Sequence, residues 1–346
     1  MLAAYVTKLD GATPLDNLAV DDRPEPEPRA GWAVVKVEAA ALNHHDIWSL
    51  RGVSSQPVTP PQILGCDAAG VVHSYGPERP GGTPDIGARV VCHAVIGCGE
   101  CPACLAGREL HCRRLALLSE GPYQGTLAEY VQVPAGNLVP LPDQVSVSAA
   151  ACLPTAYLTA YRMLFTRAAL QPGMTVLVQG ASGGLGSAAV LLARAAGVRV
   201  IAVARTPEKR EQAVRLGAEL AVAPDRDAVK AVLAHTGEGV DAVVESVGEP
   251  TWELSMRTLK PDGVIVVAGA TGGANPPLQL ARVYWRQLRV AGSTMGTRDE
   301  LARLVDLVGT GAVTPLIDAE APLSEARTLL GRMLDGEQHG KLVLRP

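Results

Sequence analysis

The apolar residues of this chain follow two patterns. Residues 1–41 carry short apolar stretches that alternate with polar ones and are broken by the proline-rich run DDRPEPEPRAG. This pattern predicts antiparallel strands joined by a proline-rich turn. Further along, apolar runs of strand length alternate with longer helical stretches, which is typical of a parallel sheet whose strands are joined by helices.

The second pattern is clearest from Met174 to Val203. MTVLVQ is a β-branched apolar run of strand length, and a glycine-rich turn follows it. Ser187–Ala196 has helical composition, Gly197 ends that helix, and Val198–Val203 is a second apolar strand. Strand, glycine turn, helix and strand together predict a βαβ unit.

The remaining elements extend this unit into a larger fold. Alternating strands and helices predict a doubly wound parallel sheet, and its later strands are expected at 220–222, 241–247, 264–269 and 289–293. A helix broken at Pro154 is expected over 146–169, amphipathic helices at 301–308 and 323–334, and a last strand from Lys341 to Arg345.

Composition limits what such a fold can do. The chain has 346 residues, of which 47% are apolar and 19% charged, and its net charge is −4. This length is sufficient for two domains. The negative net charge does not favour binding to nucleic acid or to an anionic membrane. No basic leader or long uninterrupted apolar run stands out, so we expect a cytoplasmic enzyme acting on a small molecule.

The glycines of the βαβ turn indicate nucleotide binding. Gly180, Gly183 and Gly186 would let the backbone approach a pyrophosphate at a helix N-terminus, whose N–H groups favour negative charge. The same residues also fit the G-x-S-x-G elbow of hydrolases, with Ser182 as nucleophile. That alternative requires a downstream histidine, either His235 or His339, and leaves Gly186 without a role.

Four of the seven cysteines lie close together in the sequence, at Cys98, Cys101, Cys104 and Cys112. Four thiolates at this spacing can surround one zinc ion in a closed, structural site. An iron–sulfur cluster and a metal-free cluster are the alternatives, although the spacing to the fourth cysteine differs from the ferredoxin pattern. We predict one structural zinc.

Polar residues interrupt the apolar first part at two places. The stretch Asn43–Trp48 places two histidines and a carboxylate in succession, which suggests metal ligation or proton transfer at His45. His44 faces the other way, and Asp46 could instead cap a short helix. The pair Cys66-Asp67 lies inside a strand-like run, where a small buried cysteine is the simpler interpretation.

Several motifs in this order resemble those of the medium-chain dehydrogenase/reductase family over essentially the whole chain. The motifs are ALNHHDIW, ILGCDAAGVV, the four-cysteine lobe, GTLAEYVQVP, LTAYRML, VLVQGASGGLG, VVESVGEPTWELS and YWRQLRVAGSTMGT. The resemblance implies a GroES-like catalytic domain formed by residues 1–155 and 294–346, with the zinc lobe near 93–115. It also implies a Rossmann domain over 156–293 and hydride transfer to or from nicotinamide.

The resemblance breaks at the catalytic zinc of the family's alcohol dehydrogenases. Matched by motif, the three ligand positions fall on Asn43, Cys66 and Thr155. A neutral amide and a hydroxyl are poor zinc ligands, so the sequence predicts that this second metal is lost. A rescued site that combines Cys66 with His45 or Asp67 is the alternative.

Loss of that zinc changes the expected chemistry. Alcohol oxidation needs a stabilised alkoxide, whereas an activated C=C bond or a quinone draws hydride through its own conjugated carbonyl. Such a site needs a hydrogen bond to an enolate oxygen and a proton donor. The predicted catalytic set is Asn43 as oxyanion donor, His45 as acid, and Asp46; Tyr123, Tyr157 and Tyr284 are weaker candidates for the acid.

The cofactor is predicted to be NADPH. An acidic residue that binds the ribose 2′-hydroxyl is expected at the end of the second strand, but Ala204 stands there. Arg205 and Lys209 follow and suit a 2′-phosphate. The expected cofactor-binding residues are Thr159, Gly180, Ser182, Gly183, Gly184, Leu185, Arg205, Lys209, Ser246, Val247, Gly269 and Ala270.

The sequence therefore predicts an NADPH-dependent reductase of the quinone or enoyl type with one structural zinc. The alternatives are a zinc alcohol dehydrogenase with an altered metal site and a non-catalytic NADPH-binding protein. From the resemblance we also expect a homodimer, in which the strand at 289–293 pairs across the interface.

Overall fold

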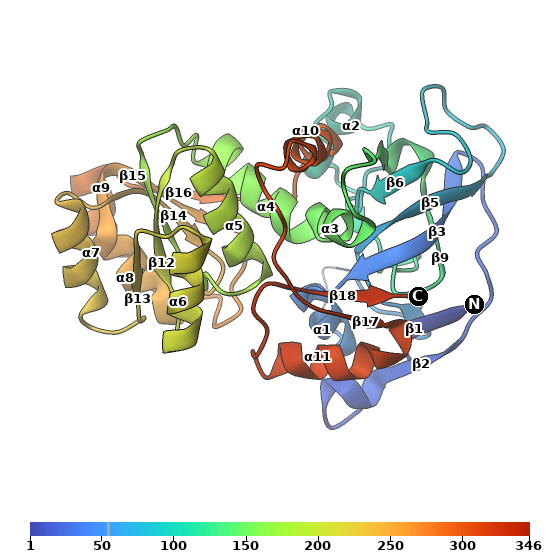
Figure 1. Ribbon diagram of the computed structural model, residues 1–346, viewed down its shortest axis with the longest axis horizontal. Coiled ribbons are helices and arrows are strands. Elements are labelled where there is room, and N and C mark those ends of the chain that lie inside the picture. Colours follow the sequence, from blue (N-terminus) through green and yellow to red (C-terminus); the bar gives the residue numbers. More distant parts are fainter. Residues whose placement is uncertain (54–55) are drawn as a thin grey trace. The chain divides into compact units, whose positions relative to one another are not determined.

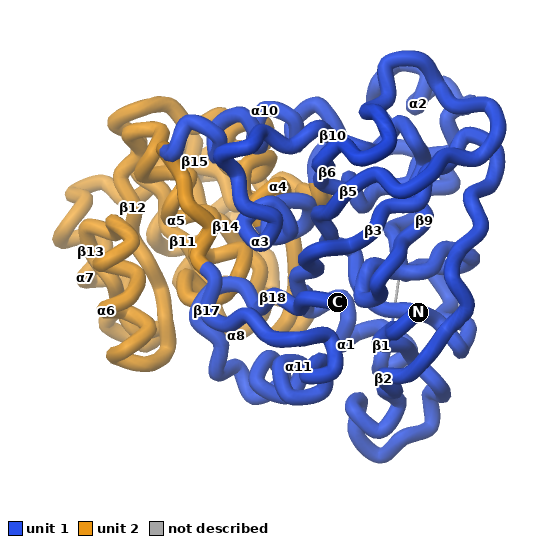
Figure 2. The backbone as a smooth tube through the Cα atoms, turned by 45° about the vertical axis from the view of Figure 1, so that its right-hand side comes forward, with its two compact units in different colours: residues 1–156, 296–311, 317–346 blue, residues 157–295, 312–316 orange. Residues whose placement is uncertain are grey.

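The computed structural model describes residues 1–53 and 56–346 and divides into two compact units (Figure 2). Unit 1 comprises residues 1–156, 296–311 and 317–346, and unit 2 comprises residues 157–295 and 312–316. The expected boundaries placed the short segment 312–316 in the catalytic domain. It belongs to unit 2, where the Leu316 N–H donates to the Tyr157 hydroxyl at 2.8 Å.

Unit 1 is rich in β-structure, as its alternating pattern predicts. Its strands are β1 (Leu2–Val6), β2 (Leu18–Asp22), β3 (Trp32–Ala41), β4 (Gln62–Ile63), β5 (Asp67–Tyr75), β6 (Arg89–Cys92), β7 (Val95–Ile96), β8 (Ala116–Leu117), β9 (Tyr130–Pro134), β10 (Leu138–Pro140), β17 (Ile317–Pro322) and β18 (Lys341–Arg345). Its helices are α1 (His44–Leu50), α2 (Pro102–Leu105), α3 (Val147–Ala151), α10 (Arg298–Gly309) and α11 (Ala326–Leu334).

The long strand β3 is the centre of this unit. A seven-stranded sheet runs in the order β10-β6-β5-β3-β18-β17, and β9 also pairs with β3. A separate three-stranded sheet has the order β2-β1-β4. Because β18 pairs with β3 while β17 pairs with β18, the C-terminal part of the chain completes the sheet begun by the N-terminal part (Figure 1).

One glycine allows β5 to follow β3 closely. A Cβ on Gly70 would lie 2.0 Å from the carbonyl oxygen of Lys36, so no larger residue fits there without moving the backbone. Val37 and Ala39 flank a shift of register opposite this point. The close approach keeps the β5 residues Asp67 and Ala68 aligned with the end of β3, next to the start of α1.

Unit 2 contains the predicted parallel sheet. Its strands are β11 (Thr175–Val178), β12 (Arg199–Val203), β13 (Leu220–Val222), β14 (Val240–Glu245), β15 (Leu259–Val267) and β16 (Arg289–Gly292). Its helices are α4 (Leu158–Tyr161), α5 (Gly184–Ala195), α6 (Pro207–Leu216), α7 (Ala228–Thr236), α8 (Glu249–Thr258) and α9 (Leu280–Arg286).

All pairs in this sheet are parallel, in the order β13-β12-β11-β14-β15-β16. Helix α5 packs beside α6 and α7 beside α8, and helices cover the sheet on both faces (Figure 1). The order runs outward from β11 in both directions, so the prediction of a doubly wound parallel sheet is confirmed.

The expected helix over 146–169 is less regular than predicted. It consists of α3, α4 and two π-helical turns at Leu153–Tyr157 and Arg162–Arg167. Pro154 has no N–H to donate, and the wider turn begins at the residue before it. Within residues 1–53 and 56–346, no helix has both the length and the apolar character required to cross a bilayer.

Candidate functional site

The four clustered cysteines form a site that fits one zinc ion. Their Sγ atoms all lie within 4.8 Å of one another, and those of Cys98 and Cys104 are 3.9 Å apart. Four sulfurs at about 2.3 Å from a tetrahedral zinc stand roughly 3.8 Å apart. This spacing leaves little room for the iron and sulfide atoms of a larger cluster.

Hydrogen-bond donors surround two of these sulfurs. The backbone N–H groups of Cys98 and Arg114 point to the Cys112 sulfur, at 3.4 and 3.3 Å, and the Cys101 N–H points to the Cys98 sulfur at 3.3 Å. A hydrogen bond from the Arg114 side chain lowers the pKa of Cys98 to about 5. Such outer partners orient metal ligands and stabilise their charge.

A second polar cluster in unit 1 is centred on the buried carboxylate of Asp67. Asn43 donates its amide N–H to Asp67 Oδ2 at 2.9 Å, and the Thr155 hydroxyl donates to Oδ1 at 2.6 Å. Lys341 Nζ lies 3.2 Å from Asp67 Oδ2 and 2.7 Å from both Asn43 Oδ1 and the Leu42 carbonyl. Both charged side chains are almost fully buried. Their attraction and their hydrogen bonds offset the cost of removing the ammonium and the carboxylate from water.

The role predicted for Asn43 changes in this light. Its amide nitrogen also donates to the Ala41 carbonyl at 3.3 Å, so both N–H groups of the amide are already used within the protein. Asn43 is therefore occupied in orienting Asp67 and Lys341, and it is not placed to donate to a substrate oxygen. The sequence pattern could not show this, because the partners come from the ends of β3, β5 and β18.

Asp46 takes the capping role that the sequence left open. It lies in the first turn of α1, and its two oxygens accept the N–H groups of Asn43 at 2.8 Å and Gly65 at 3.0 Å. Burial raises the pKa of Asp46 to about 6. Because the carboxylate is buried and shared between two backbone segments, we assign it to holding α1 against the loop before β5.

His45 lies between a thiol and a carboxylate. Its Nδ1 is 3.4 Å from Cys66 Sγ, and its Nε2 is 3.1 Å from Glu120 Oε1. Burial alone lowers the pKa of His45, but Cys66, Glu120 and Asp46 outweigh it and hold that pKa well above its ordinary value. Burial raises the pKa of the Cys66 thiol, which also donates to the Leu118 carbonyl at 3.2 Å.

The three tyrosines considered as acids have other surroundings. Tyr123 stacks on Trp32, Tyr157 is buried with its hydroxyl accepting the Leu316 N–H, and Tyr284 is exposed at the surface of unit 2. His44 is exposed on α1. Among the predicted proton donors, His45 alone is joined to a neighbouring acid and a thiol in unit 1.

In unit 2, the glycine turn has the shape that phosphate binding requires. Gly180 has a φ of +60°, and Gly183 precedes the first turn of α5, which begins with Gly184 and Leu185. A Cβ on Gly186 would lie 2.2 Å from the Gly180 carbonyl oxygen, so this glycine allows α5 to pack closely on the turn. Ser182 lies in the same turn, before the helix.

Four other predicted cofactor residues lie at the carboxyl ends of the parallel strands. Ser246 and Val247 follow β14, Gly269 and Ala270 follow β15, and Thr159 is buried in α4. Glu245, which the sequence reading did not single out, is fully buried; its Oε1 accepts the N–H groups of Val247 at 2.8 Å and Gly248 at 3.0 Å. A carboxylate at the end of an apolar strand was the available signal for it.

The turn after β12 carries cations and no acid. Ala204 is buried, Arg205 is exposed, and the Lys209 side chain is 9% exposed. Arg210 donates from its guanidinium to the carbonyls of Ala204 at 3.2 Å and Arg205 at 2.8 Å, which fixes the turn. Arg210 lies one turn into α6 and is not among the residues predicted from the sequence.

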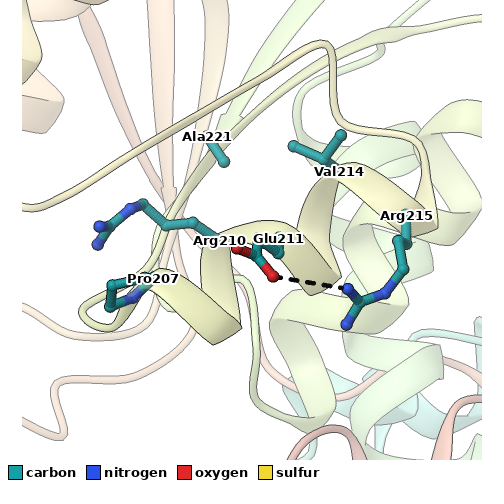
Figure 3. Close-up of a pocket in the computed structure, with 6 residues that line it drawn as sticks. All are labelled: Pro207, Arg210, Glu211, Val214, Arg215 and Ala221. Atoms are coloured by element: carbon teal, nitrogen blue, oxygen red, sulfur yellow. Dashed lines mark ion pairs between the residues drawn. The ribbon is translucent and has the colours of Figure 1, made fainter.

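Beside α6 the surface has a hollow of about 560 Å³ (Figure 3). It is lined by Pro207, Arg210, Glu211, Val214, Arg215 and Ala221. Arg215 pairs with Glu211 at 3.9 Å, and the lining includes neither Arg205 nor Lys209. Neither of the two cations predicted to bind the 2′-phosphate therefore lines this hollow.

Comparison with known proteins assigns the fold to a family. The sequence model described as "Alcohol dehydrogenase GroES-like domain" matches residues 29–143, and the one described as "Zinc-binding dehydrogenase" matches residues 184–310. An alcohol dehydrogenase of Geobacillus stearothermophilus is 31% identical over 333 residues, which cover 95% of this chain and 96% of the relative. The chain is a medium-chain dehydrogenase/reductase.

Two solved structures of similar proteins differ in activity. An NAD-dependent alcohol dehydrogenase superposes with a TM-score of 0.93 at 36% identity, covering 100% of both chains. The 2-octenoyl-CoA carboxylase reductase CinF, in complex with NADP and 2-octenoyl-CoA, superposes with a TM-score of 0.92 at 26% identity, covering 99% of this chain and 87% of CinF. This medium-chain dehydrogenase/reductase is therefore an oxidoreductase with relatives of both kinds.

The residues at the family's catalytic zinc position do not fit a zinc ion. Asn43 and Thr155 are hydrogen-bonded to Asp67, beside the buried ammonium of Lys341. In the rescued site, Cys66 Sγ and His45 Nδ1 lie 3.4 Å apart, but no third His, Cys, Asp or Glu side chain of the described residues joins these two closely enough to share an ion. In the described part of this medium-chain dehydrogenase/reductase, the only group of three or more His, Cys, Asp or Glu side chains close enough to share an ion is the four-cysteine cluster.

The geometry of unit 2 argues against His235 as the base of the hydrolase alternative. His235 is at the C-terminal end of α7 and pairs with Glu219 at 3.2 Å, just before β13 begins. Ser182 follows the carboxyl end of β11. In a parallel sheet, the amino and carboxyl ends of the strands lie on opposite sides of the sheet. This medium-chain dehydrogenase/reductase therefore cannot use His235 to activate Ser182.

Proposed function

We propose that this protein is an NADPH-dependent reductase that transfers hydride to an activated C=C bond or a quinone without a catalytic zinc. The observation that carries the proposal is the cluster around Asp67. It places a fixed ammonium and neutral hydrogen-bonding groups where the family's alcohol dehydrogenases need soft metal ligands. Without a Lewis acid to stabilise an alkoxide, the acceptor must be electrophilic by itself.

The chemistry then divides between cofactor and protein. NADPH, when bound, supplies the hydride to the electron-poor carbon of the acceptor, and the electron pair moves onto the acceptor's carbonyl oxygen. The protein must stabilise that oxygen and supply one proton. His45 suits this task, because its pKa is raised and its side chain is 11% exposed, while Asn43 and Thr155 already donate to Asp67.

The preference for NADPH rests on the turn after β12. No carboxylate stands at Ala204 to bind a ribose 2′-hydroxyl or to repel a 2′-phosphate, and Arg205 is exposed directly beside it. CinF, the relative that binds an enoyl-CoA, has NADP in its structure. The alcohol dehydrogenase of the other structure is NAD-dependent by name, so the choice of cofactor needs a direct test.

Two measurements on the purified protein test the proposal. Metal content should be near one zinc per chain, and oxidation of bound NADPH in a stopped-flow instrument should be fast with enones and quinones. A second zinc per chain together with alcohol oxidation would support an altered alcohol dehydrogenase. Tight NADPH binding without oxidation by any acceptor would support a non-catalytic binding protein.

We also propose that the chain forms a homodimer through the edge of its parallel sheet. β16 is the last strand in the order, so its outer edge has no partner within the described residues. Apolar side chains are exposed on and near it, at Leu278, Leu280, Tyr284, Trp285 and Val290. A second copy that pairs along β16 would satisfy the edge and cover this apolar surface.

A further inference from the structure

We infer that the buried carboxylate of Glu245 positions two loops of unit 2 for binding the nicotinamide nucleotide. The loops are residues 246–248, which follow β14, and residues 268–273, which follow β15. Both lie at the carboxyl edge of the parallel sheet, and β14 adjoins β11 where the strand order reverses, the place where open sheets of this kind bind ligands. The inference applies to NADPH and NADH alike, so it goes beyond the proposed reductase and does not depend on it.

Four neutral groups donate hydrogen bonds to this carboxylate. Its Oε1 accepts the backbone N–H groups of Val247 at 2.8 Å and Gly248 at 3.0 Å. The Thr251 hydroxyl lies 3.0 and 3.1 Å from the two oxygens, and the Ser255 hydroxyl donates to Oε2 at 2.7 Å. A carboxylate has about four acceptor sites, so both oxygens are fully used. Glu245 is fully buried, and the positive N-terminal end of α8 partly compensates its charge.

The carboxylate is also connected to the glycine turn before α5. Because the Ser255 hydroxyl gives its hydrogen to Glu245, its oxygen is free to accept the Gln179 amide N–H at 2.9 Å. Gln179 is fully buried and directly precedes Gly180. Val247 approaches the same turn, since a Cβ on Gly180 would lie 3.5 Å from Val247 Cγ2. A displacement of Glu245 would therefore move groups that touch the turn predicted to hold the pyrophosphate.

Backbone hydrogen bonds join loop 246–248 to loop 268–273. Two N–H groups of the second loop donate to two carbonyls of the first, Thr271 to Ser246 at 3.2 Å and Gly272 to Val247 at 2.7 Å. Gly248 is buried with a φ of +92°, and a Cβ there would lie 2.1 Å from the Gly273 carbonyl oxygen, so only glycine allows this close approach. The two loops are therefore held as one unit, and Glu245 fixes that unit to α8.

This anchoring affects binding because ordering a loop costs free energy. Ser246 and Val247 are only half-buried, so apolar burial holds loop 246–248 weakly. The charge-assisted bonds from two successive N–H groups to one carboxylate oxygen hold it instead. If the ordered loops were populated only about one-tenth of the time, the apparent dissociation constant of a nucleotide would rise about tenfold. Glu245 offers no free oxygen to a ligand, so it acts on affinity as a positioning residue.

A purely structural role for Glu245 predicts a different outcome. A carboxylate that only supported the fold would lower the free energy of unfolding when removed, and the protein that stayed folded would bind nucleotide normally. A positioning role predicts weaker binding by the folded protein and faster exchange confined to the two loops. It also predicts equal weakening of NADPH and NADH, which differ only in the 2′-phosphate. In this respect Glu245 differs from Arg205, which is predicted to distinguish the two nucleotides.

The test uses the full chain and the variant Glu245→Gln, which keeps the shape of the side chain and removes its charge. The dissociation constants of NADPH and NADH, measured by fluorescence titration, should both rise about tenfold. In the free variant, amide hydrogen exchange should increase in residues 246–248 and 270–273, and saturating NADPH should return it to the wild-type level, because the ligand then orders the loops. Thr251→Val, which keeps the carboxylate and removes one donor, should raise both constants about threefold.

Glu253→Gln is the matched control. Glu253 lies on the same helix with its side chain 70% exposed, and it pairs with Arg257 at 3.3 Å, so this variant should change neither binding nor exchange.

Unchanged constants in a folded Glu245→Gln variant would overturn the inference, and so would a loss confined to one of the two nucleotides. If Glu245→Gln does not fold, Thr251→Val decides, and wild-type constants in that variant would overturn the inference as well. A wild type that binds neither nucleotide would overturn both this inference and the proposed reductase. A wild type that binds NADPH but reduces no acceptor would refute the reductase alone.

Discussion

At the scale of single residues, the candidate site is defined by what each polar group is bonded to. Asn43 and Thr155 are at the family's metal-ligand positions, yet each of them donates a hydrogen bond to Asp67. Lys341 supplies the positive charge that this buried carboxylate requires. The cluster therefore contains a cation of its own, held by covalent attachment to the chain.

The first prediction concerns that cation. Lys341→Met should lower the free energy of unfolding by about 3–5 kcal/mol, because it leaves Asp67 buried without its ionic partner. Lys230→Met, at an exposed lysine on α7, should change it by no more than about 0.5 kcal/mol. Urea unfolding measures both, and similar small effects would show that the Asp67–Lys341 pair does not stabilise the fold.

The second prediction concerns the cofactor. Arg205→Ala should weaken NADPH binding about 10- to 100-fold, the value of one or two charge-assisted hydrogen bonds, and leave NADH binding within about twofold. Arg215→Ala, on α6 but paired with Glu211, is the control and should change neither. Titration of protein fluorescence gives the constants; equal weakening of NADH and NADPH would refute the 2′-phosphate contact.

At the scale of elements, the sequence was more informative about strands than about the long segment before them. The strands of unit 2 lie close to their predicted places because an apolar run between helices has few alternatives. β15 begins earlier than expected, at Leu259, which pairs with Val240. The segment 146–169 is divided by π-helical turns, which its continuous apolar composition did not show.

The third prediction belongs to the exposed edge of unit 2. Trp285→Glu, on α9, should convert the proposed dimer to a monomer, because it places a charge in the apolar surface beside β16. Val214→Glu, at a half-exposed position on α6, should leave the dimer intact. Light scattering during gel filtration gives the mass, and a wild-type monomer would refute this interface.

At the scale of the whole molecule, the zinc lobe connects to distant parts of unit 1. Residues 98–112 lie between β7 and β8, and the turn that holds Glu120 follows β8 directly. Glu109, in the lobe, accepts the Arg298 backbone N–H at 3.1 Å, where α10 begins. The four-cysteine lobe therefore adjoins the turn that follows β8 and bonds to the start of α10, which is far from the cysteines in the sequence.

The fourth prediction follows from these connections. Removing zinc with a strong chelator should increase amide hydrogen exchange in residues 97–120 and in the first turn of α10, since the lobe loses its crosslink. Exchange in the parallel sheet of unit 2 should stay unchanged. Mass spectrometry of exchanged peptides measures this, and protection that is independent of zinc would contradict a structural role for the metal.

The sequence alone determined the features that depend on neighbours along the chain. Apolar periodicity predicted the parallel sheet, glycine spacing predicted the turn before α5, and four cysteines within fifteen residues predicted the metal lobe. Each of these is local, because the hydrogen bonds or ligands that define it lie within one short segment or between successive strands.

Only the tertiary structure decided which side chains of the candidate site contact one another. Glu120 reaches His45 across 75 positions, and Lys341 reaches Asn43 across 298. No periodicity records such contacts, since they depend on β18 closing the sheet and on the turn after β8. These long-range contacts give Asn43 and Asp46 structural roles in place of the catalytic roles predicted from the sequence. They also place Glu120 beside His45.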